Sequence, residues 1–373
     1  MMRPAPGDAS ISDADTARRW WSVRGVAAGV VLLAVMAGCA KDAPQDYLDP
    51  SGPIAVQADH LFRKLLWFAV VPVLVLVEAL LVVALFRFRH RPGQDAPRLR
   101  DHKLRWVVAP TLILLAVDLF PLVGEAGEIF DLAHEPEGDV LQVEVYGHMW
   151  WWEYIYPESK ISTANELHIP TGRPIRLTLR SIEPGLDAPE AGKYAQGVLH
   201  SFWVPKLAGK QDVVPGRDNK LTLAADKPGT YRGQCAEYCN LSHANMRLRV
   251  IAQKPADFEA WVREQQRPAV KPASGAAAAG YDIFTGEGGC ISCHTVVGVA
   301  GAEGRVGPNL THLKSRTTFA GAIFENTTTN LTKWVRDPPA MKPMRPDKGT
   351  GMPDQGLSDA EVHKVVAYLE TLE

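Results

Sequence analysis

Side chains suited to redox chemistry gather in two short segments of this 373-residue chain. The first reads Cys235-Ala-Glu-Tyr-Cys239-Asn-Leu-Ser-His243-Ala-Asn-Met246, which places two thiols, an imidazole and a thioether on one loop. Such soft donors favour copper over hard cations, and a histidine with a weakly bound methionine is typical of blue-copper sites. A blue-copper site uses one cysteine. Two cysteines four residues apart could instead bridge a pair of copper ions, with His200 as a second imidazole.

The second segment, Cys290-Ile-Ser-Cys293-His294, is the C-x-x-C-H signature for attachment of a c-type haem. The two thiols add across the haem vinyl groups, and the adjacent imidazole binds the iron. Gly307-Pro308 resembles the proximal loop of c-type cytochromes, in which the Pro308 carbonyl would accept a hydrogen bond from the His294 ring. An ordinary turn is the alternative for Pro308.

The sixth ligand of the iron must be a soft or imidazole donor after His294. The candidates are Met341, Met344, Met352 and His363. His363 falls on the polar side of the terminal helix pattern, so we expect it to face solvent. Met352-Pro353 resembles the methionine-proline segment before the last helix of c-type cytochromes. We therefore predict Met352 as the ligand, with Met344 as its rival; positions in a surface loop are the alternative for Met341 and Met344.

Other interpretations of the first segment stay open. An exported protein could join Cys235 and Cys239 in a structural disulfide, but that pairing gives His243 and Met246 no role. Thiolates and imidazoles also bind zinc, to which a methionine three residues after the histidine adds nothing. A copper-chaperone lipoprotein can carry C-x-x-x-C and a distant histidine, although there the histidine follows the cysteines and no haem domain is attached.

The N-terminal region predicts export. Arginines precede an apolar run at residues 26–37, the order of a secretory signal over residues 1–38. Small residues before Cys39 resemble a bacterial lipobox, which would make Cys39 a lipidated N-terminus; an uncleaved first helix is the alternative. Residues 39–64 then form an exported N-terminal segment.

Two apolar stretches predict a transmembrane hairpin over residues 65–123. Residues 65–86 contain one ionisable group, Glu78, and reach about 33 Å as a helix, enough to cross a bilayer core. Residues 106–123 form a shorter second span, for which a buried core helix is the alternative. The connecting loop is rich in arginine and lysine, so the positive-inside rule places it in the cytoplasm and both outer ends outside.

The exported part divides into two domains joined by a linker. Residues 138–255 alternate apolar and polar side chains between Pro/Gly turns, which predicts a β-sandwich or barrel. Its clearest runs are 141–146, 175–179, 220–223 and 229–233. Residues 256–279, rich in Pro, Ala and Gly toward their end, are interpreted as a linker. Residues 280–373 predict a small all-α domain, with Ser358 and Glu361 as a capping box. Its helical patterns are 281–287 and 358–372.

Composition limits the classes of partner. The 40 Lys+Arg against 42 Asp+Glu give a formal net charge of −2, so the bulk charge does not indicate a nucleic-acid binder. Five cysteines are too few for a disulfide scaffold in a chain of this length. Partners must therefore be inferred from the two segments and the predicted spans.

At the first segment the chain resembles subunit II of haem–copper cytochrome oxidases, in the caa type whose cupredoxin-like CuA domain is fused to a cytochrome c domain. The family pattern is a distant His and then C-x-E-x-C-x-x-x-H-x-x-M, and the domain order also matches. The resemblance implies a dinuclear copper site bridged by the two cysteines. Its implied ligands are His200, Cys235, the Glu237 carbonyl, Cys239, His243 and Met246. The Glu237 side chain would face a Mg²⁺ shared with subunit I.

Two positions depart from the family pattern. Asn240 stands where many relatives have glycine, and asparagine also tolerates left-handed backbone angles. In Tyr146-Gly-His-Met-Trp150-Trp-Trp-Glu-Tyr154, Met149 replaces the glutamine of Y-G-x-Q-W-x-W-x-Y. The alignment implies that Trp150 corresponds to an exposed tryptophan thought to pass electrons toward CuA. A buried core position is the alternative for these aromatic residues.

The implied function is the electron-entry subunit of a terminal oxidase in a bacterial inner membrane. Electrons would pass from the fused haem to CuA, both on the periplasmic face, and on to subunit I for O₂ reduction coupled to proton translocation. Two spans cannot hold two haems and a copper, so the oxygen chemistry lies elsewhere. Implied partners are subunit I with haem a, haem a3 and CuB, subunit III, a bc1-type complex or cytochrome c as donor, and membrane lipid. A nitrous oxide reductase-like CuA protein and a copper-delivery lipoprotein are the alternatives.

Overall fold

The computed structural model describes residues 44–87, 103–124, 138–182 and 197–373. The predicted signal over residues 1–38, Cys39 and most of the basic loop lie outside the described residues. The chain forms two units, residues 1–46 and 47–373, and the elements below belong to the second.

One long apolar helix runs from Pro53 to Arg87 and contains the predicted first span. It consists of α2 (Pro53–Leu65), a π-helical turn (Leu66–Val70) and α3 (Val71–Arg87). Its most apolar stretch has a mean hydropathy of 2.9, and in the described part of the chain it is the one helix long and apolar enough to cross a membrane. The helix starts at Pro53, so the second half of the predicted exported segment, residues 39–64, is helical and continuous with the span.

The early start of this helix has a packing reason. Ala55 is buried, and a Cβ on Gly52 would lie 2.2 Å from the Ala224 carbonyl oxygen. The Ser51 amide donates to the Lys206 carbonyl at 2.8 Å. The first turn of α2 therefore packs against the β domain that follows in the chain.

Helix α4 (Lys103–Gly124) covers the predicted second span. The apolar part described within it, Val107–Ala116, is shorter than a membrane crossing requires. The structure thus contains a helix at the predicted place without confirming a two-span hairpin.

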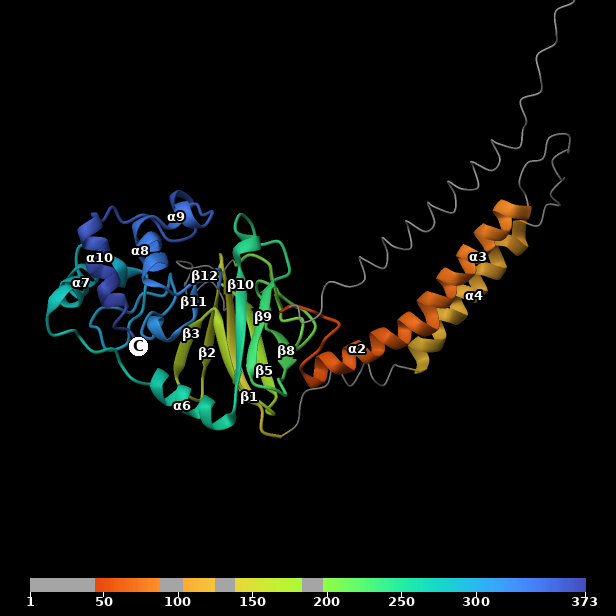
Figure 1. The fold of residues 1–373 in the computed structure, drawn as a ribbon, viewed down its shortest axis with the longest axis horizontal. Helices are drawn as coiled ribbons and strands as arrows, with labels where there is room; N and C mark the ends of the chain where they lie inside the picture. The colour runs from red at the N-terminus through yellow and green to blue at the C-terminus, as the bar shows by residue number, and fades with distance from the viewer. Residues whose placement is uncertain (1–43, 88–102, 125–137, 183–196) are drawn as a thin grey trace, which may run out of the picture. The chain divides into compact units, whose positions relative to one another are not determined.

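Ten strands form two five-stranded sheets between residues 141 and 253 (Figure 1). The first sheet has the order β3-β2-β1-β5-β8, and the second has the order β4-β10-β9-β6-β7. The strands of the first sheet are β1 (Leu141–His148), β2 (Trp151–Tyr156), β3 (Ile161–Ala164), β5 (Ile175–Ser181) and β8 (Asn219–Leu223). Those of the second are β4 (Glu166–Pro170), β6 (His200–Trp203), β7 (Gln211–Val213), β9 (Gly229–Cys235) and β10 (Arg247–Gln253).

The alternation that predicted these strands is the reason they pack as two layers. In β5 the residues Ile175, Leu177 and Leu179 have no exposed area, whereas the polar residues between them are partly exposed. Strand β1 pairs with β2 in antiparallel and with β5 in parallel orientation. The predicted β architecture is therefore confirmed, with a sandwich of two sheets around one apolar core.

Helix α6 (Pro255–Gln265) occupies the first part of the predicted linker. Phe258 is buried in the core of the β domain, and the Trp261 ring stacks on His168 with centroids 4.2 Å apart. The interpretation of residues 256–279 as a linker is therefore wrong for this helix. Its aromatic residues cover the sheet and bury apolar area, which favours an ordered helix.

The C-terminal region is the predicted all-α domain. Its helices are α7 (Gly275–Thr285), α8 (Thr328–Arg336), α9 (Pro338–Met341) and α10 (Asp359–Leu369), with a two-stranded ribbon of β11 (Thr318–Phe319) and β12 (Phe324–Glu325). Short 3₁₀ turns lie at Cys290–Ser292, Leu313–Ser315 and Pro346–Lys348. The capping box at Ser358 and Glu361 is confirmed, because each side chain bonds the backbone amide of the other residue.

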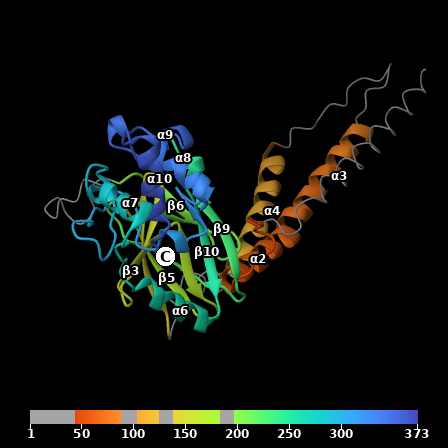
Figure 2. The ribbon, with the colours of Figure 1, turned by 60° about the vertical axis from the view of Figure 1, so that its left-hand side comes forward.

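Helices α7 and α10 pack directly on each other and hold this domain together (Figure 2). A Cβ on Gly280 would lie 1.9 Å from the Lys364 carbonyl oxygen, so the crossing requires glycine. The Tyr281 and Phe284 rings meet Tyr368 edge-on. Helix α7 begins before residue 281 because its small residues allow this close approach.

Candidate copper and haem sites

Strand ends bring the copper-type donors together. His200 is the first residue of β6 and Cys235 the last of β9, and these strands pair with Phe202 opposite Cys235. The loop then passes through a 3₁₀ turn, His243–Asn245, and Met246 directly precedes β10. Both ends of the loop are therefore fixed by the second sheet.

The donor atoms of this cluster lie within 4 Å of their neighbours. The Cys235 sulfur is 3.7 Å from the Cys239 sulfur, 3.8 Å from His200 Nδ1 and 3.2 Å from the Glu237 carbonyl oxygen. The Cys239 sulfur is 3.6 Å from His243 Nδ1 and 3.8 Å from Met246 Sδ. The other four predicted donors thus lie around the two sulfurs.

Burial and charge suit this cluster to a soft metal. Cys235, Cys239, His200 and Met246 are buried, and both cysteines are free thiols. The hydrogen bond between the two sulfurs lowers the pKa of Cys235 to about 3 and raises the pKa of Cys239, because one proton serves the pair. Burial lowers the pKa of His200, so its imidazole is neutral and able to bind a metal. The two thiols, two imidazoles and thioether fit copper.

Asn240 adopts the left-handed backbone that the family pattern reserves for glycine. Its φ is +81°, and its side-chain oxygen accepts a hydrogen bond from the Leu241 amide at 2.9 Å. Asparagine is one of the few non-glycine residues for which this conformation is inexpensive. The expected tolerance is therefore confirmed.

Trp150 touches the copper loop. Its indole Nε1 donates to the Cys239 carbonyl oxygen at 2.7 Å. The expectation of an exposed tryptophan is wrong here, since only 2% of its surface is exposed. Residues of the C-terminal domain cover it: Lys342 Nζ donates to the Trp150 carbonyl, and Met344 belongs to the same apolar cluster.

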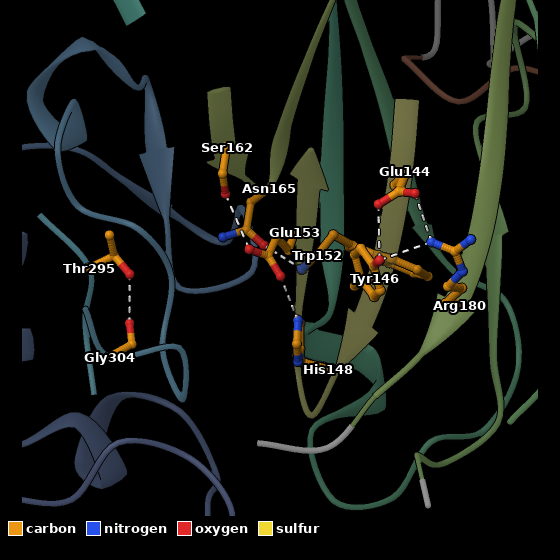
Figure 3. A network of polar contacts seen from close by, with 10 residues as sticks. All are labelled: Glu144, Tyr146, His148, Trp152, Glu153, Ser162, Asn165, Arg180, Thr295 and Gly304. Atoms are coloured by element: carbon orange, nitrogen blue, oxygen red, sulfur yellow. Dashed lines mark hydrogen bonds and ion pairs between the residues drawn. The ribbon is translucent and has the colours of Figure 1, made fainter. Parts of the chain in front are cut away.

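Polar contacts fix the β1–β2 hairpin that carries Trp150 (Figure 3). His148 points toward Glu153, with Nε2 3.3 Å from the carboxylate, and its ring stacks on Trp151. The Asn165 side chain accepts a hydrogen bond from the Trp152 amide at 3.0 Å. The hairpin tip therefore has little freedom to move away from the copper loop.

The haem segment has its proximal side in place. Cys290 starts a 3₁₀ turn, and His294 Nδ1 lies 2.8 Å from the Pro308 carbonyl oxygen, as predicted from the sequence. This hydrogen bond leaves Nε2 as the nitrogen for iron. A Cβ on Gly307 would lie 2.4 Å from the His294 ring, so the ring sits directly against a glycine.

A cavity opens in front of His294. Its lining includes Cys290, Cys293, His294, Arg316, Met344 and Met352, together with Trp150 and Trp151 from the β domain. Arg316 is a buried cation that donates one hydrogen bond to the Asn309 carbonyl, while its Nε has no partner among the described residues. A haem carries carboxylates that need such a cation in a buried site. The cavity, the thiols and the imidazole fit a c-type haem.

Both candidate methionines line this cavity. Met344 is buried, which excludes for this residue the alternative of a surface loop. A Cβ built on Gly351 would lie 2.4 Å from its sulfur, which shows that Met344 Sδ packs against this backbone. Met352 is partly exposed at the cavity wall, and His363 is exposed as expected. Met352 stays the predicted ligand, since the Met344 sulfur is already packed against protein.

Sequence reasoning missed two buried charged residues beside these sites. Glu166 begins β4 and Lys342 follows α9; both are buried. Burial lowers the pKa of Lys342 to about 7, opposed by attraction to Cys239. No local pattern marks a single glutamate in an apolar strand or a lysine before proline as special, so only the packed structure reveals them.

Comparisons with known proteins agree with these two sites. Residues 141–253 match the family model described as cytochrome c oxidase subunit II, periplasmic domain, and residues 277–373 match that of cytochrome c. The cytochrome c oxidase subunit 2 of Alkalihalophilus pseudofirmus is 33% identical over 351 residues, which cover 91% of this chain and 94% of that protein. The chain belongs to the cytochrome c oxidase subunit II family.

Further relatives place this subunit II in context. The subunit 2 of Bacillus subtilis is 30% identical, covering 92% of this chain and 97% of that protein. A solved structure of the periplasmic domain of subunit II from Bradyrhizobium japonicum is 26% identical, covers 35% of this chain and 96% of that chain, and has a TM-score of 0.30. The chain is thus a subunit II of a haem–copper oxidase with a cytochrome c domain.

Proposed function

We propose that this subunit II receives electrons on a haem c in residues 280–373, passes them to a dinuclear CuA in residues 138–255 and delivers them to subunit I. The observation that carries the proposal is the convergence of both donor sets on Trp150. Its indole bonds the Cys239 carbonyl, and the residue lines the cavity in front of His294. A path through bonded and packed protein atoms of this kind favours electron transfer between the two sites.

Cys235 and Cys239 would hold two copper ions between their sulfurs. His200 and Met246 would complete one ion, and His243 with the Glu237 carbonyl the other. Each sulfur lies beside one donor of each ion, as expected of a sulfur shared by both. A copper pair in this donor set supplies a one-electron couple. The sheet holds these donors in fixed positions, which keeps the reorganisation on oxidation and reduction small.

Cys290 and Cys293 would attach the haem, with His294 and Met352 as axial ligands. Pro308 keeps the His294 ring oriented through its hydrogen bond, and Arg316 provides positive charge at the cavity wall. A methionine ligand favours a high potential, which suits a donor to copper.

The proposed membrane arrangement uses α3 and α4 as its two spans. We infer two spans over residues 65–86 and 106–123, a bacterial inner membrane, and both redox domains on the periplasmic face. Cys39 would add a lipid anchor. Partners would be subunit I with its haems and CuB, subunit III, and a bc1-type complex or cytochrome c upstream, with Mg²⁺ at Glu237 and proton translocation in the assembled oxidase.

Metal content and spectra of the purified chain test this function. We expect two copper ions for each iron, a mixed-valence dinuclear copper signal in paramagnetic resonance, and the optical bands of a c-type haem. A copper-delivery protein would show a single copper ion and no haem, and a zinc site would show no copper signal. Either result would overturn the proposal.

A further inference from the structure

Lys342 is a buried cation at the contact between the two redox domains. Only 3% of it is exposed, and its ammonium group donates to the Trp150 carbonyl at 2.7 Å and to the Ala320 carbonyl at 2.9 Å. The first acceptor lies in the copper domain and the second in the cytochrome domain. Because a buried ammonium is costly without acceptors, this side chain favours the docked arrangement in which both carbonyls are present.

Glu166 is the matching anion, contributed by the copper domain. It has no exposed area. Its carboxylate accepts hydrogen bonds from the amides of Thr317 and Thr318 at 3.0 and 2.7 Å and from both hydroxyl groups at 2.6 Å. All four donors belong to the cytochrome domain. Hydrogen bonds to an ionised acceptor are roughly twice as strong as neutral ones, so this contact is specific and strong.

The backbones of the two domains also meet closely beside Lys342. The Arg247 amide donates to the Gly321 carbonyl at 2.9 Å. A Cβ on Gly321 would lie 2.6 Å from the Asn245 carbonyl oxygen, and its φ is +84°. Glycine is therefore required for the cytochrome loop to reach the end of the copper loop.

The connection between the domains leaves little slack. Helix α6 packs on the β domain through Phe258, Trp261 and Val262 and ends at Gln265, and the Ala269 amide already donates to the Val297 carbonyl of the cytochrome domain at 2.8 Å. Helix α7 begins at Gly275. A long swinging tether does not fit these contacts.

We propose that Lys342 and Glu166 latch the cytochrome domain onto the copper domain, so that the haem delivers electrons from one fixed pose. Lys342 is a positioning residue, acting through Trp150, whose indole bonds the Cys239 carbonyl. The electron-transfer part rests on the proposed function, whereas the latch rests on the hydrogen bonds alone. The alternative to the latched arrangement is a haem domain that undocks and redocks during each electron transfer.

The double variant Lys342→Met/Glu166→Ala tests the latch in the full chain carrying copper and haem. Its matched control is Lys348→Met/Glu158→Ala, which removes one exposed lysine and one exposed glutamate. Hydrogen exchange at the Arg247 amide reports docking, since this amide pairs with Gly321 across the contact. The rate of haem-to-copper transfer after a reductive pulse, measured at several solvent viscosities, reports the electron-transfer pose.

In the wild type and the control we expect a protected Arg247 amide and a transfer rate independent of viscosity. The double variant loses several hydrogen bonds to charged groups, so its docking constant should fall at least about tenfold. We expect faster hydrogen exchange at the Arg247 amide and a slower haem-to-copper transfer rate that depends on viscosity.

Thr318→Val removes one donor to Glu166 with little change of shape, so it replaces the double variant if that one folds poorly. We expect it to cause an intermediate loss of protection at the Arg247 amide. The latch is wrong if the double variant keeps wild-type protection and rate, or if the wild-type rate already falls with viscosity. Missing copper or haem spectra in the wild type would instead contradict the proposed function, while the exchange data would still test the latch.

Discussion

Three of the copper-site donors lie at or beside strand ends, whereas the haem site takes its ligands from a turn and a loop. His200, Cys235 and Met246 are therefore placed by the hydrogen-bonded ladder of the second sheet. The His294 ring makes one hydrogen bond, to Pro308, and two methionines line the same cavity. The copper site is thus specified by the sheet, and the sixth haem ligand by a loop that could have presented either sulfur.

Serine at Cys235 or Cys239 is expected to have the largest effect, complete loss of the dinuclear copper signal with the haem bands unchanged. In the proposed site each thiolate would bind both ions, and a hydroxyl is a poor ligand for them. Paramagnetic resonance and optical spectra of the holoprotein measure both sites at once. Asn240→Gly in the same loop is the control and should keep the copper signal; a normal dinuclear spectrum in either serine variant would reject the assignment.

Gly280→Ala should destabilise the cytochrome domain and leave the copper domain intact. The new methyl group would lie 1.9 Å from the Lys364 carbonyl, so α7 and α10 must separate, at a cost of about 3 kcal/mol or more in free energy of unfolding. Chemical unfolding followed through the haem absorbance measures the change. Ala276→Ser, at an exposed position of the same helix, should cost little, and equal stability of the two variants would show that the crossing is not tight.

Acid should weaken the packing of α6 on the sheet. Burial lowers the pKa of His168 to about 4, below its usual 6.5, so the unfolded chain takes up the proton first. Stability from this group is complete above pH 6.5 and is lost as the pH falls toward 4, by up to about 3 kcal/mol. Thermal unfolding of the β domain by circular dichroism checks this, and His168→Gln should show a flatter profile; parallel profiles would exclude His168 as the cause.

Met352→Ala sharpens the ligand choice on the haem side. It should erase the weak near-infrared sulfur-to-iron band of the oxidised haem and lower its potential, while Met344→Ala keeps the band. Met344→Ala should instead loosen the apolar cluster shared with Trp150. The reverse ranking of the two variants would transfer the ligand role to Met344.

Met246→Ala is expected to have the smallest effect. A thioether binds copper more weakly than a bridging thiolate, so the dinuclear signal should persist with a changed potential and a broader spectrum. Redox titration of the copper absorbance measures the shift. Complete loss of copper would mean that Met246 holds the site together rather than tuning it.

Local sequence spacing predicted the sites better than it predicted what covers them. The loop from Cys235 to Met246 and the contact of His294 with Pro308 follow from residues close in the chain or from a recognisable motif. The burial of Trp150 depends on Lys342, almost two hundred residues away, and no periodicity records that contact. Helix α6 was mistaken for linker because its aromatic residues pack on His168 of another element.

The small residues at the start of the haem domain likewise show what composition does not predict. Residues 271–280 contain almost no large side chain, which predicted an unstructured segment. Gly280 instead lets two helices cross at short distance, so small size is the property that builds the contact. Composition alone cannot distinguish a glycine that frees the backbone from one that admits a neighbour.

In the proposed function one chain holds both the donor and the acceptor of an electron. A reductive pulse that places a single electron on the haem of the oxidised holoprotein tests it directly, with the haem and copper absorbances followed together. We expect the haem to reoxidise as the copper site is reduced, at a rate independent of protein concentration. In Cys235→Ser the electron should stay on the haem. An electron that remains on the wild-type haem, or a rate that rises with protein concentration, would contradict it.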